Sequence, residues 1–211
     1  MRSNSRIAII DYGVGNVRSV ANALEFLGYR VVITHQRADI EAAPALVLPG
    51  VGAFGEAMDR IKALGIGPLL TEQVRQRGKP ILGICLGMQL LAESSAENGR
   101  HQGLCLLPAQ VVPIPPRSGI KVPQVGWNTV TVHRREILFP RTTDDSAFYF
   151  DHSLHLVCPP EYVAATVPYG GDLVAAVQRD NVLGVQFHPE KSHNSGLRLF
   201  RSFFSHYGIS R

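Results

Sequence analysis

The residues best suited to chemistry lie in the segment Gly83-Ile84-Cys85-Leu86-Gly87. An apolar, strand-like run precedes it and a helix-like run follows, so the cysteine stands where a strand turns into a helix. Glycines two residues before and after Cys85 let the backbone turn tightly without a collision at Cβ. This is the layout of a nucleophile elbow with sulfur in place of a serine oxygen. The start of a helix also favours a thiolate. The alternative is a buried structural cysteine beside a glycine turn.

A second candidate segment, His188-Pro189-Glu190, follows the strand-like run 182–187. A cysteine nucleophile needs a neighbouring base, and that base needs an orienting group; His188 and Glu190 fit these two roles. Pro189 stops the strand and fixes the backbone angle φ. Because strand ends gather at one edge of an open α/β sheet, we predict that Cys85, His188 and Glu190 meet there as a catalytic triad.

Length and composition favour a single domain over residues 1–211, because a chain of 211 residues that is 45% hydrophobic can bury a core. No apolar run reaches membrane-spanning length, and residues 1–6 lack the apolar region of a secretory signal. The three cysteines, Cys85, Cys105 and Cys158, are odd in number and do not have the spacing of a disulfide framework, which is typical of proteins in the reducing cytosol. We therefore expect a cytoplasmic protein without membrane association. A net charge of +4 from scattered Lys and Arg does not indicate nucleic-acid binding.

Strand-like and helix-like patterns alternate over residues 6–95, which predicts an α/β fold with a mostly parallel central sheet and helices on both faces. From about residue 105, short strands and prolines take over and predict a smaller antiparallel β portion in the C-terminal half. The expected strands are 7–10, 31–33, 45–48 and 80–84, with a hairpin over 173–187; the expected helices are 17–27, 54–64, 68–77, 88–93 and 197–204.

Two glycine loops follow predicted strands. In Gly13-Val14-Gly15 the third glycine of a dinucleotide fingerprint is replaced by Arg18, which argues against a nucleotide cofactor. The turn Pro49-Gly50-Val51-Gly52 lies at the same sheet edge as Cys85, so one of its N–H groups could face a reacting carbonyl; a plain βα turn is the alternative. His152 and His155 have no third ligand nearby, so no metal is predicted.

Together these segments resemble the class I glutamine amidotransferases over nearly the whole chain. Within that class the sequence is similar to the glutaminase subunits of imidazole glycerol phosphate synthases, to which the Gly-Trp-Asn segment and Lys191-Ser192 point. The segments that carry the resemblance are Ile10-Asp11-Tyr12-Gly13, Gly15-Asn16, Pro49-Gly50-Val51-Gly52-Ala53-Phe54, Gly83-Ile84-Cys85-Leu86-Gly87-Met88-Gln89, Val122-Pro123, Gly126-Trp127-Asn128 and 184–192.

The resemblance implies a flavodoxin-like fold and an activity. Cys85 would attack the side-chain amide of L-glutamine, while His188, oriented by Glu190, would shuttle protons. The N–H groups of Leu86 and Val51 would hold the oxyanion. Gly52, Gln89 and Ser153 would bind the glutamine. Ammonia would pass to a (β/α)₈-barrel cyclase subunit, bound as a heterodimer, for histidine biosynthesis. No cofactor is implied.

The resemblance also places a docking face for the cyclase at Lys121, Trp127, Asn128 and Lys191. A large aromatic residue and lysines suit an interface. For Trp127, the chain's only tryptophan, ordinary core packing is the alternative.

Three positions depart from the family pattern. Gln124 and Val125 replace a histidine and an aliphatic residue, and Leu154 replaces a tyrosine. These changes keep one other interpretation open, a paralogous amidotransferase that supplies ammonia to a different synthase, for example in sugar amidination. A separate alternative is a non-catalytic scaffold subunit that kept the elbow but lost turnover; the presence of all three triad residue types argues against it.

Overall fold

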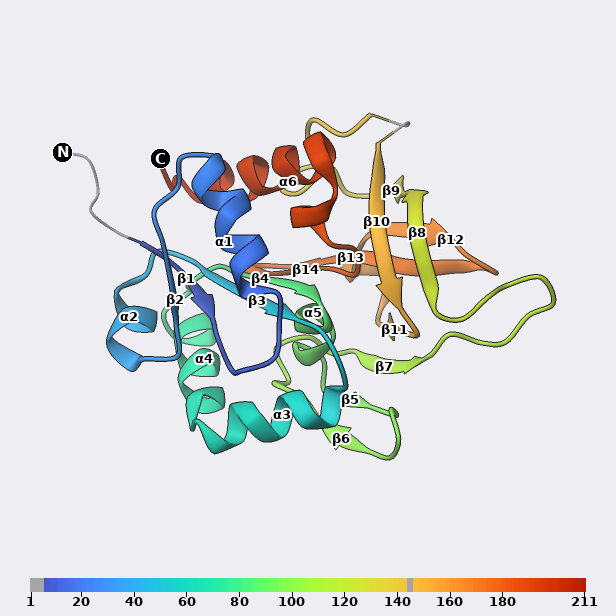
Figure 1. The fold of residues 1–211 in the computed structure, drawn as a ribbon, viewed down its shortest axis with the longest axis horizontal. Coiled ribbons are helices and arrows are strands. Elements are labelled where there is room, and N and C mark those ends of the chain that lie inside the picture. The colour runs from blue at the N-terminus through green and yellow to red at the C-terminus, as the bar shows by residue number, and fades with distance from the viewer. Residues whose placement is uncertain (1–5, 144–145) are drawn as a thin grey trace.

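An eight-stranded sheet forms the centre of the computed structural model, which describes residues 6–143 and 146–211 (Figure 1). Residues 1–5, most of the segment considered for a secretory signal, lie outside the described part. In spatial order the strands are β2 (Val31–Thr34), β1 (Ile7–Ile10), β3 (Leu46–Gly50), β4 (Ile81–Cys85), β14 (Val182–Val185), β13 (Asp172–Arg179), β12 (Val163–Pro168) and β9 (Thr131–Val132).

The first five strands of that order are parallel, and the other three extend the sheet in antiparallel fashion. The hairpin expected over residues 173–187 is present as β13–β14, although β14 ends at Val185 rather than at residue 187. The prediction of a mostly parallel central sheet is therefore confirmed.

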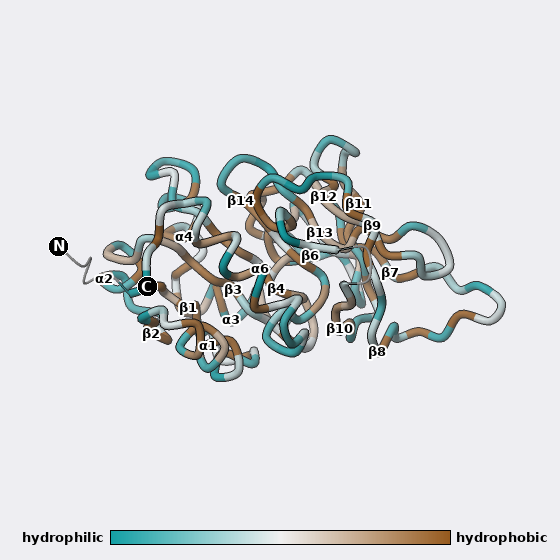
Figure 2. Tube along the Cα trace, turned by 90° about the horizontal axis from the view of Figure 1, so that it is seen from above, coloured by the Kyte–Doolittle hydropathy of each residue, from teal (hydrophilic) through white to brown (hydrophobic). Residues whose placement is uncertain are grey.

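Helices cover both faces of this sheet, as predicted. In Figure 1, α1 (Val17–Phe26) and α6 (His193–His206) lie above it, whereas α2 (Arg37–Ala42), α3 (Phe54–Ala63), α4 (Ile66–Arg75) and α5 (Leu86–Leu90) lie below. Alternation along β1 explains the two layers. Ile7 and Ile9 join the hydrophobic cluster under α1 and α6, while Ala8 and Ile10 join the cluster under α2 to α5. Figure 2 shows the resulting apolar interior as brown strand segments.

Two smaller sheets stand beside the central one. The first pairs β8 (Gln124–Thr129) with β10 (Ala147–His152), and the second joins β11 (Leu154–Val157), β7 (Gln110–Pro113), β5 (Ser94–Ser95) and β6 (His101–Gln102). Most of these pairings are antiparallel, as predicted, but β5 and β6 come from before residue 105. Two short 3₁₀ turns, η1 (Pro160–Tyr162) and η2 (Pro189–Lys191), complete the described structure. The loop between β7 and β8 projects away from the body (Figure 1).

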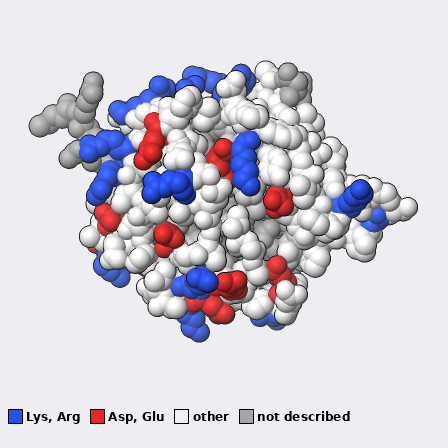
Figure 3. All heavy atoms as spheres, in the orientation of Figure 1, with Lys and Arg blue, Asp and Glu red and all other residues white. Residues whose placement is uncertain are grey.

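The short helix α2 was not predicted. Ile40 is its only buried residue, so its six residues carry no apolar periodicity. Across the described residues, no helix combines the length and apolar character needed to cross a membrane. On the face drawn in Figure 3, Lys and Arg gather along the upper edge near α6 and are otherwise interspersed with Asp and Glu.

Candidate active site

Cys85 occupies the sharp turn between β4 and α5. Its backbone has φ 54° and ψ −113°, a conformation that is strained for any residue with a Cβ. The side chain is 5% exposed and lines a cavity of about 170 Å³. A strained turn that presents the cysteine to a cavity is what a nucleophile elbow requires.

Two glycines on neighbouring strands allow α5 to approach the sheet closely. Gly83 on β4 and Gly184 on β14 are register partners, and both lie beneath Met88. A Cβ at Gly83 would stand 2.7 Å from the Met88 Cα, and a Cβ at Gly184 would collide with the Met88 side chain. Because both Cβ atoms are absent, the first turn of α5, directly after Cys85, can lie close against the two strands.

His188 reaches the same edge from β14, the parallel neighbour of β4. Val185 on β14 pairs with Ile84, so the chain segments that follow both strands leave the sheet side by side. The His188 Nδ1 lies 2.8 Å from Glu190 Oε1, with only 3% and 1% of the two side chains exposed. The structure thus brings together Cys85, His188 and Glu190, the three residues predicted as a triad.

The environment of His188 favours its protonated form. Burial alone would lower the pKa of its imidazole, but hydrogen bonds to the Cys85 sulfur and to the Glu190 carboxylate raise the pKa to about 10. Among the described residues, Glu190 Oε2 is buried with no hydrogen-bond partner, so no other donor competes with His188 for this carboxylate. An imidazolium beside the sulfur can deliver a proton to a leaving group.

The cavity brings the other predicted ligand-binding residues together. Val51, Gly52, Leu86, Gln89 and Ser153 all line it, together with Cys85 and His188. Leu86 is the first residue of α5, where backbone N–H groups have no partner within the helix. The cavity therefore contains every residue predicted for the oxyanion and for the substrate.

Tyr12 is a residue near the site that the sequence analysis did not assign. Its buried hydroxyl donates a hydrogen bond of 2.8 Å to the Pro49 carbonyl, at the start of the Pro49–Gly52 turn. A Cβ on Gly50 would collide with the Tyr12 hydroxyl. The loop that follows β1 thus contacts, through Tyr12, the turn that carries Val51. An aromatic residue two positions after β1, at the edge where the turn was predicted, was the available signal.

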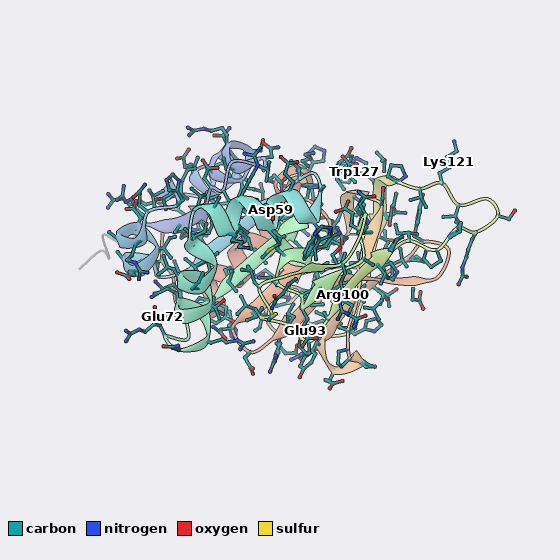
Figure 4. The ribbon with its side chains drawn as sticks, turned by 90° about the horizontal axis from the view of Figure 1, so that it is seen from below. Asp59, Glu72, Glu93, Arg100, Lys121 and Trp127 are labelled. Carbon is teal, nitrogen blue, oxygen red and sulfur yellow. The ribbon has the colours of Figure 1, made fainter. Side chains whose placement is uncertain are left out.

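The predicted docking residues do not all share one face: Trp127 and Lys191 both contact Tyr149, whereas Asn128 is only partly exposed and accepts a hydrogen bond from the buried Gln124. Trp127 on β8 is 46% exposed and stacks on His193 with ring centroids 4.9 Å apart. Lys191 lies over the Tyr149 ring, 5.3 Å from its centroid. Lys121 stands on the loop between β7 and β8, on the same side as Trp127 in Figure 4. Because Trp127 is half exposed, core packing does not describe it.

The departures from the family pattern occupy different environments. Gln124 is fully buried; its Oε1 lies 3.0 Å from His152 Nε2 and its Nε2 donates to Asn128 Oδ1. Val125 is 57% exposed beside Trp127. Leu154 lines the cavity. The first change places a buried amide within hydrogen-bond distance of a buried imidazole, whereas Val125 keeps an aliphatic side chain on the exposed face.

Within residues 6–143 and 146–211, no group of three His, Cys, Asp or Glu side chains is arranged to hold a metal ion. All three cysteines are free thiols.

Comparison with known sequences matches this geometry. The family described as glutamine amidotransferase class-I matches residues 8–207. The imidazole glycerol phosphate synthase subunit HisH 2 of Vibrio vulnificus is 47% identical over 199 residues, covering 94% of this chain and 93% of its own. The subunit HisH of Moorella thermoacetica is 48% identical over 198 residues, with 93% of each chain covered.

Solved structures share the fold. A putative GMP synthase subunit from Thermoplasma acidophilum superimposes with a TM-score of 0.71 at 22% identity, over 97% of this chain and 93% of its own. A second structure, of a glutamine amidotransferase, gives a TM-score of 0.73 at 21% identity, over 96% of this chain and 99% of its own. With its cysteine elbow, the neighbouring His–Glu pair and a family match over almost its whole length, this chain belongs to the class I glutamine amidotransferases.

Proposed function

We propose that this chain is the glutaminase subunit of an imidazole glycerol phosphate synthase, which releases ammonia from L-glutamine for histidine biosynthesis in the cytoplasm. The observation that carries the proposal is the buried row of Cys85, His188 and Glu190 at the edge of two adjacent parallel strands. Relatives that are 47% and 48% identical and carry that subunit name support the choice of synthase.

The proposed chemistry uses Cys85, His188 and Glu190 in turn. The Cys85 sulfur attacks the side-chain amide carbon of glutamine and forms a tetrahedral oxyanion. When this intermediate collapses, His188 gives its proton to the departing nitrogen, and ammonia leaves behind a thioester. Water then attacks the thioester while His188 accepts its proton, so that glutamate is released and the thiolate returns. Glu190 keeps the imidazole ring oriented through both steps.

We assign the oxyanion to the N–H groups of Leu86 and Val51. Leu86 follows the nucleophile at the start of α5, and Val51 lines the same cavity. Gly52, Gln89 and Ser153 are proposed to bind the glutamine molecule. Loss of one oxyanion donor typically costs about 10²–10³ in turnover, so the position of the Pro49–Gly52 turn is critical for the rate.

The ammonia is proposed to pass to a (β/α)₈-barrel cyclase subunit bound at Lys121, Trp127, Asn128 and Lys191. A half-exposed tryptophan that packs against Tyr149, over whose ring Lys191 lies, is the kind of anchor that carries binding energy at interfaces. One glutaminase and one cyclase would form a heterodimer.

The test uses the complex with the cyclase and two substrates. Cys85→Ala should abolish glutamine-dependent synthesis, yet leave synthesis from added ammonium salts intact, because ammonium bypasses the triad. Cys158→Ala is the matched control, since Cys158 is also a free cysteine but does not line the cavity; it should retain both activities. Loss of both activities in Cys85→Ala would contradict the division of labour between the subunits.

A paralogue that serves another synthase is the second candidate, favoured by Leu154, which lines the cavity at a position where the family pattern has a tyrosine. Complementation of a histidine auxotroph that lacks this subunit, with the cognate cyclase co-expressed, separates the two. Growth supports the histidine pathway, whereas failure despite soluble expression of both subunits supports the paralogue.

A further inference from the structure

Gln186 is a buried polar residue that the mechanism above does not use. It lies just after β14, two residues before His188, and its side chain is fully buried. Its Nε2 lies 3.7 Å from the Cys85 sulfur, within the range of an N–H···S hydrogen bond. Burying a carboxamide costs free energy unless both its oxygen and its NH₂ group form hydrogen bonds. The contact of this carboxamide with the reacting sulfur therefore suggests a role in the function of the site.

The orientation of this carboxamide is fixed by a chain of hydrogen bonds that starts at a backbone carbonyl. The Leu154 oxygen can only accept, and Gln89 Nε2 donates to it over 3.2 Å. The same Gln89 Nε2 donates over 3.0 Å to Gln186 Oε1. With its oxygen held by Gln89, Gln186 must turn its NH₂ group towards Cys85. The sulfur therefore faces a donor.

The opposite side of the sulfur shows why a donor is useful. The Asp151 carbonyl oxygen lies 3.8 Å from the Cys85 sulfur and can accept a hydrogen bond only from a thiol. Once the thiol loses its proton, that contact is lost, and the anion needs N–H groups around it. His188 supplies one such group, since it bonds the Cys85 sulfur as well as Glu190, and Gln186 is placed to supply another.

We propose that Gln186 is a positioning residue for the nucleophile, whose N–H donates to the Cys85 thiolate while Gln89 and the Leu154 carbonyl hold the carboxamide in that orientation. The inference deepens the proposed glutaminase function and rests on it. Gln89 thereby connects the substrate cavity, which it lines, to the group that stabilises the sulfur.

The pH dependence of Cys85 reactivity is the appropriate readout, so the titratable groups around the sulfur have to be kept constant. His188 and Glu190 approach from the segment after β14, Tyr12 from the loop after β1, and Asp151 and His152 from β10. None of them is changed in the variants below, so a shift in the profile reports the loss of the carboxamide.

The experiment measures alkylation of Cys85 by iodoacetamide from pH 5 to pH 10 in the full chain, alone and in complex with the cyclase. In Gln186→Leu, alkylation at pH 7 should slow roughly tenfold, and the pH of half-maximal rate should rise by about one unit. Gln178→Leu is the matched control, because Gln178 is also a buried glutamine, 4% exposed, on the adjacent strand β13. Its profile should equal that of the parent chain.

Gln186→Met, which keeps the length of the side chain, serves if Gln186→Leu does not fold; circular dichroism and the melting temperature establish folding. A folded Gln186 variant with the parent profile would overturn the proposal. If neither variant folds, the carboxamide is a determinant of folding and the proposal is rejected. Alkylation requires neither glutamine nor turnover, so a parental profile in a variant of an active glutaminase refutes only the role of Gln186, whereas absent glutaminase activity in the parent complex refutes the proposed function.

Discussion

Replacing Tyr12 with phenylalanine tests whether the first loop holds the oxyanion turn in place. Burial raises the pKa of Tyr12, with the nearby Cys85 and Asp11 adding to the effect, so the hydroxyl stays protonated and can donate to the Pro49 carbonyl. Tyr12→Phe keeps the ring and removes only this donor. The buried carbonyl oxygen is then left without its partner.

The size of the effect follows from that geometry. Leaving one buried acceptor unsatisfied costs about 2 kcal/mol. For a chain of 211 residues, each kcal/mol lowers Tm by about 2–4 °C, which gives a fall of about 4–8 °C. The Pro49–Gly50 peptide immediately precedes Val51, so we also expect kcat for glutamine hydrolysis to fall about tenfold, less than the loss of a whole oxyanion donor.

The assay combines thermal unfolding of the chain with glutaminase kinetics of the cyclase complex. Tyr207→Phe is the matched control, since the Tyr207 hydroxyl also donates to a carbonyl, that of Asp180, but at an exposed site and over 3.2 Å. Its free energy of unfolding should change by less than about 0.5 kcal/mol. If Tyr12→Phe has the Tm and the kcat of Tyr207→Phe, the hydroxyl does not hold the turn, and the reasoning from Tyr12 to Val51 is refuted.

Two further predictions concern the docking face and the second buried histidine. Trp127→Ala should weaken binding of the cyclase by about 2 kcal/mol, roughly 30-fold in Kd, with little loss of Tm, because the ring is half exposed; an unchanged Kd with a large loss of Tm would instead make Trp127 a structural residue. Burial lowers the pKa of His152 to about 4 from its usual 6.5. Between pH 4 and pH 6.5, this histidine is therefore protonated in the unfolded chain but neutral in the folded chain. Stability should therefore fall as pH drops from 6.5 to 4, by about 1.4 kcal/mol per pH unit from this residue, and urea unfolding of His152→Gln should show a shallower pH dependence; equal slopes would contradict the assignment.

The elbow and the His188-Pro189-Glu190 segment could be predicted from sequence because each motif consists of consecutive residues. Each motif follows an apolar strand, and parallel strands bring their ends to one edge, so local patterns were enough to place Cys85 near His188. The central sheet was predictable for the same reason, since each βα unit is a continuous stretch of chain.

Contacts between distant segments were not predictable. Gln186 sits in an apolar run and reads as one more strand residue; only the fold shows that its carboxamide meets Cys85, 101 positions away in the chain. The pairing of β8 with β10 joins strands that are separated in the sequence by β9, with no hairpin signal between them. The exposure of Trp127 likewise depends on that pairing and on the approach of His193, which no periodicity of β8 encodes.

The two glycines under Met88 differ in how much variation they permit. At position 184 the added carbon would meet only side chains, those of Met88 and Val177, so an alanine there could be accommodated by smaller residues at positions 88 and 177. At position 83 it would meet the main chain of Gly87 and Met88, which no exchange of side chains can move aside. Position 184 can therefore accept substitution when its neighbours change with it, whereas position 83, on the strand that carries Cys85, has to remain glycine.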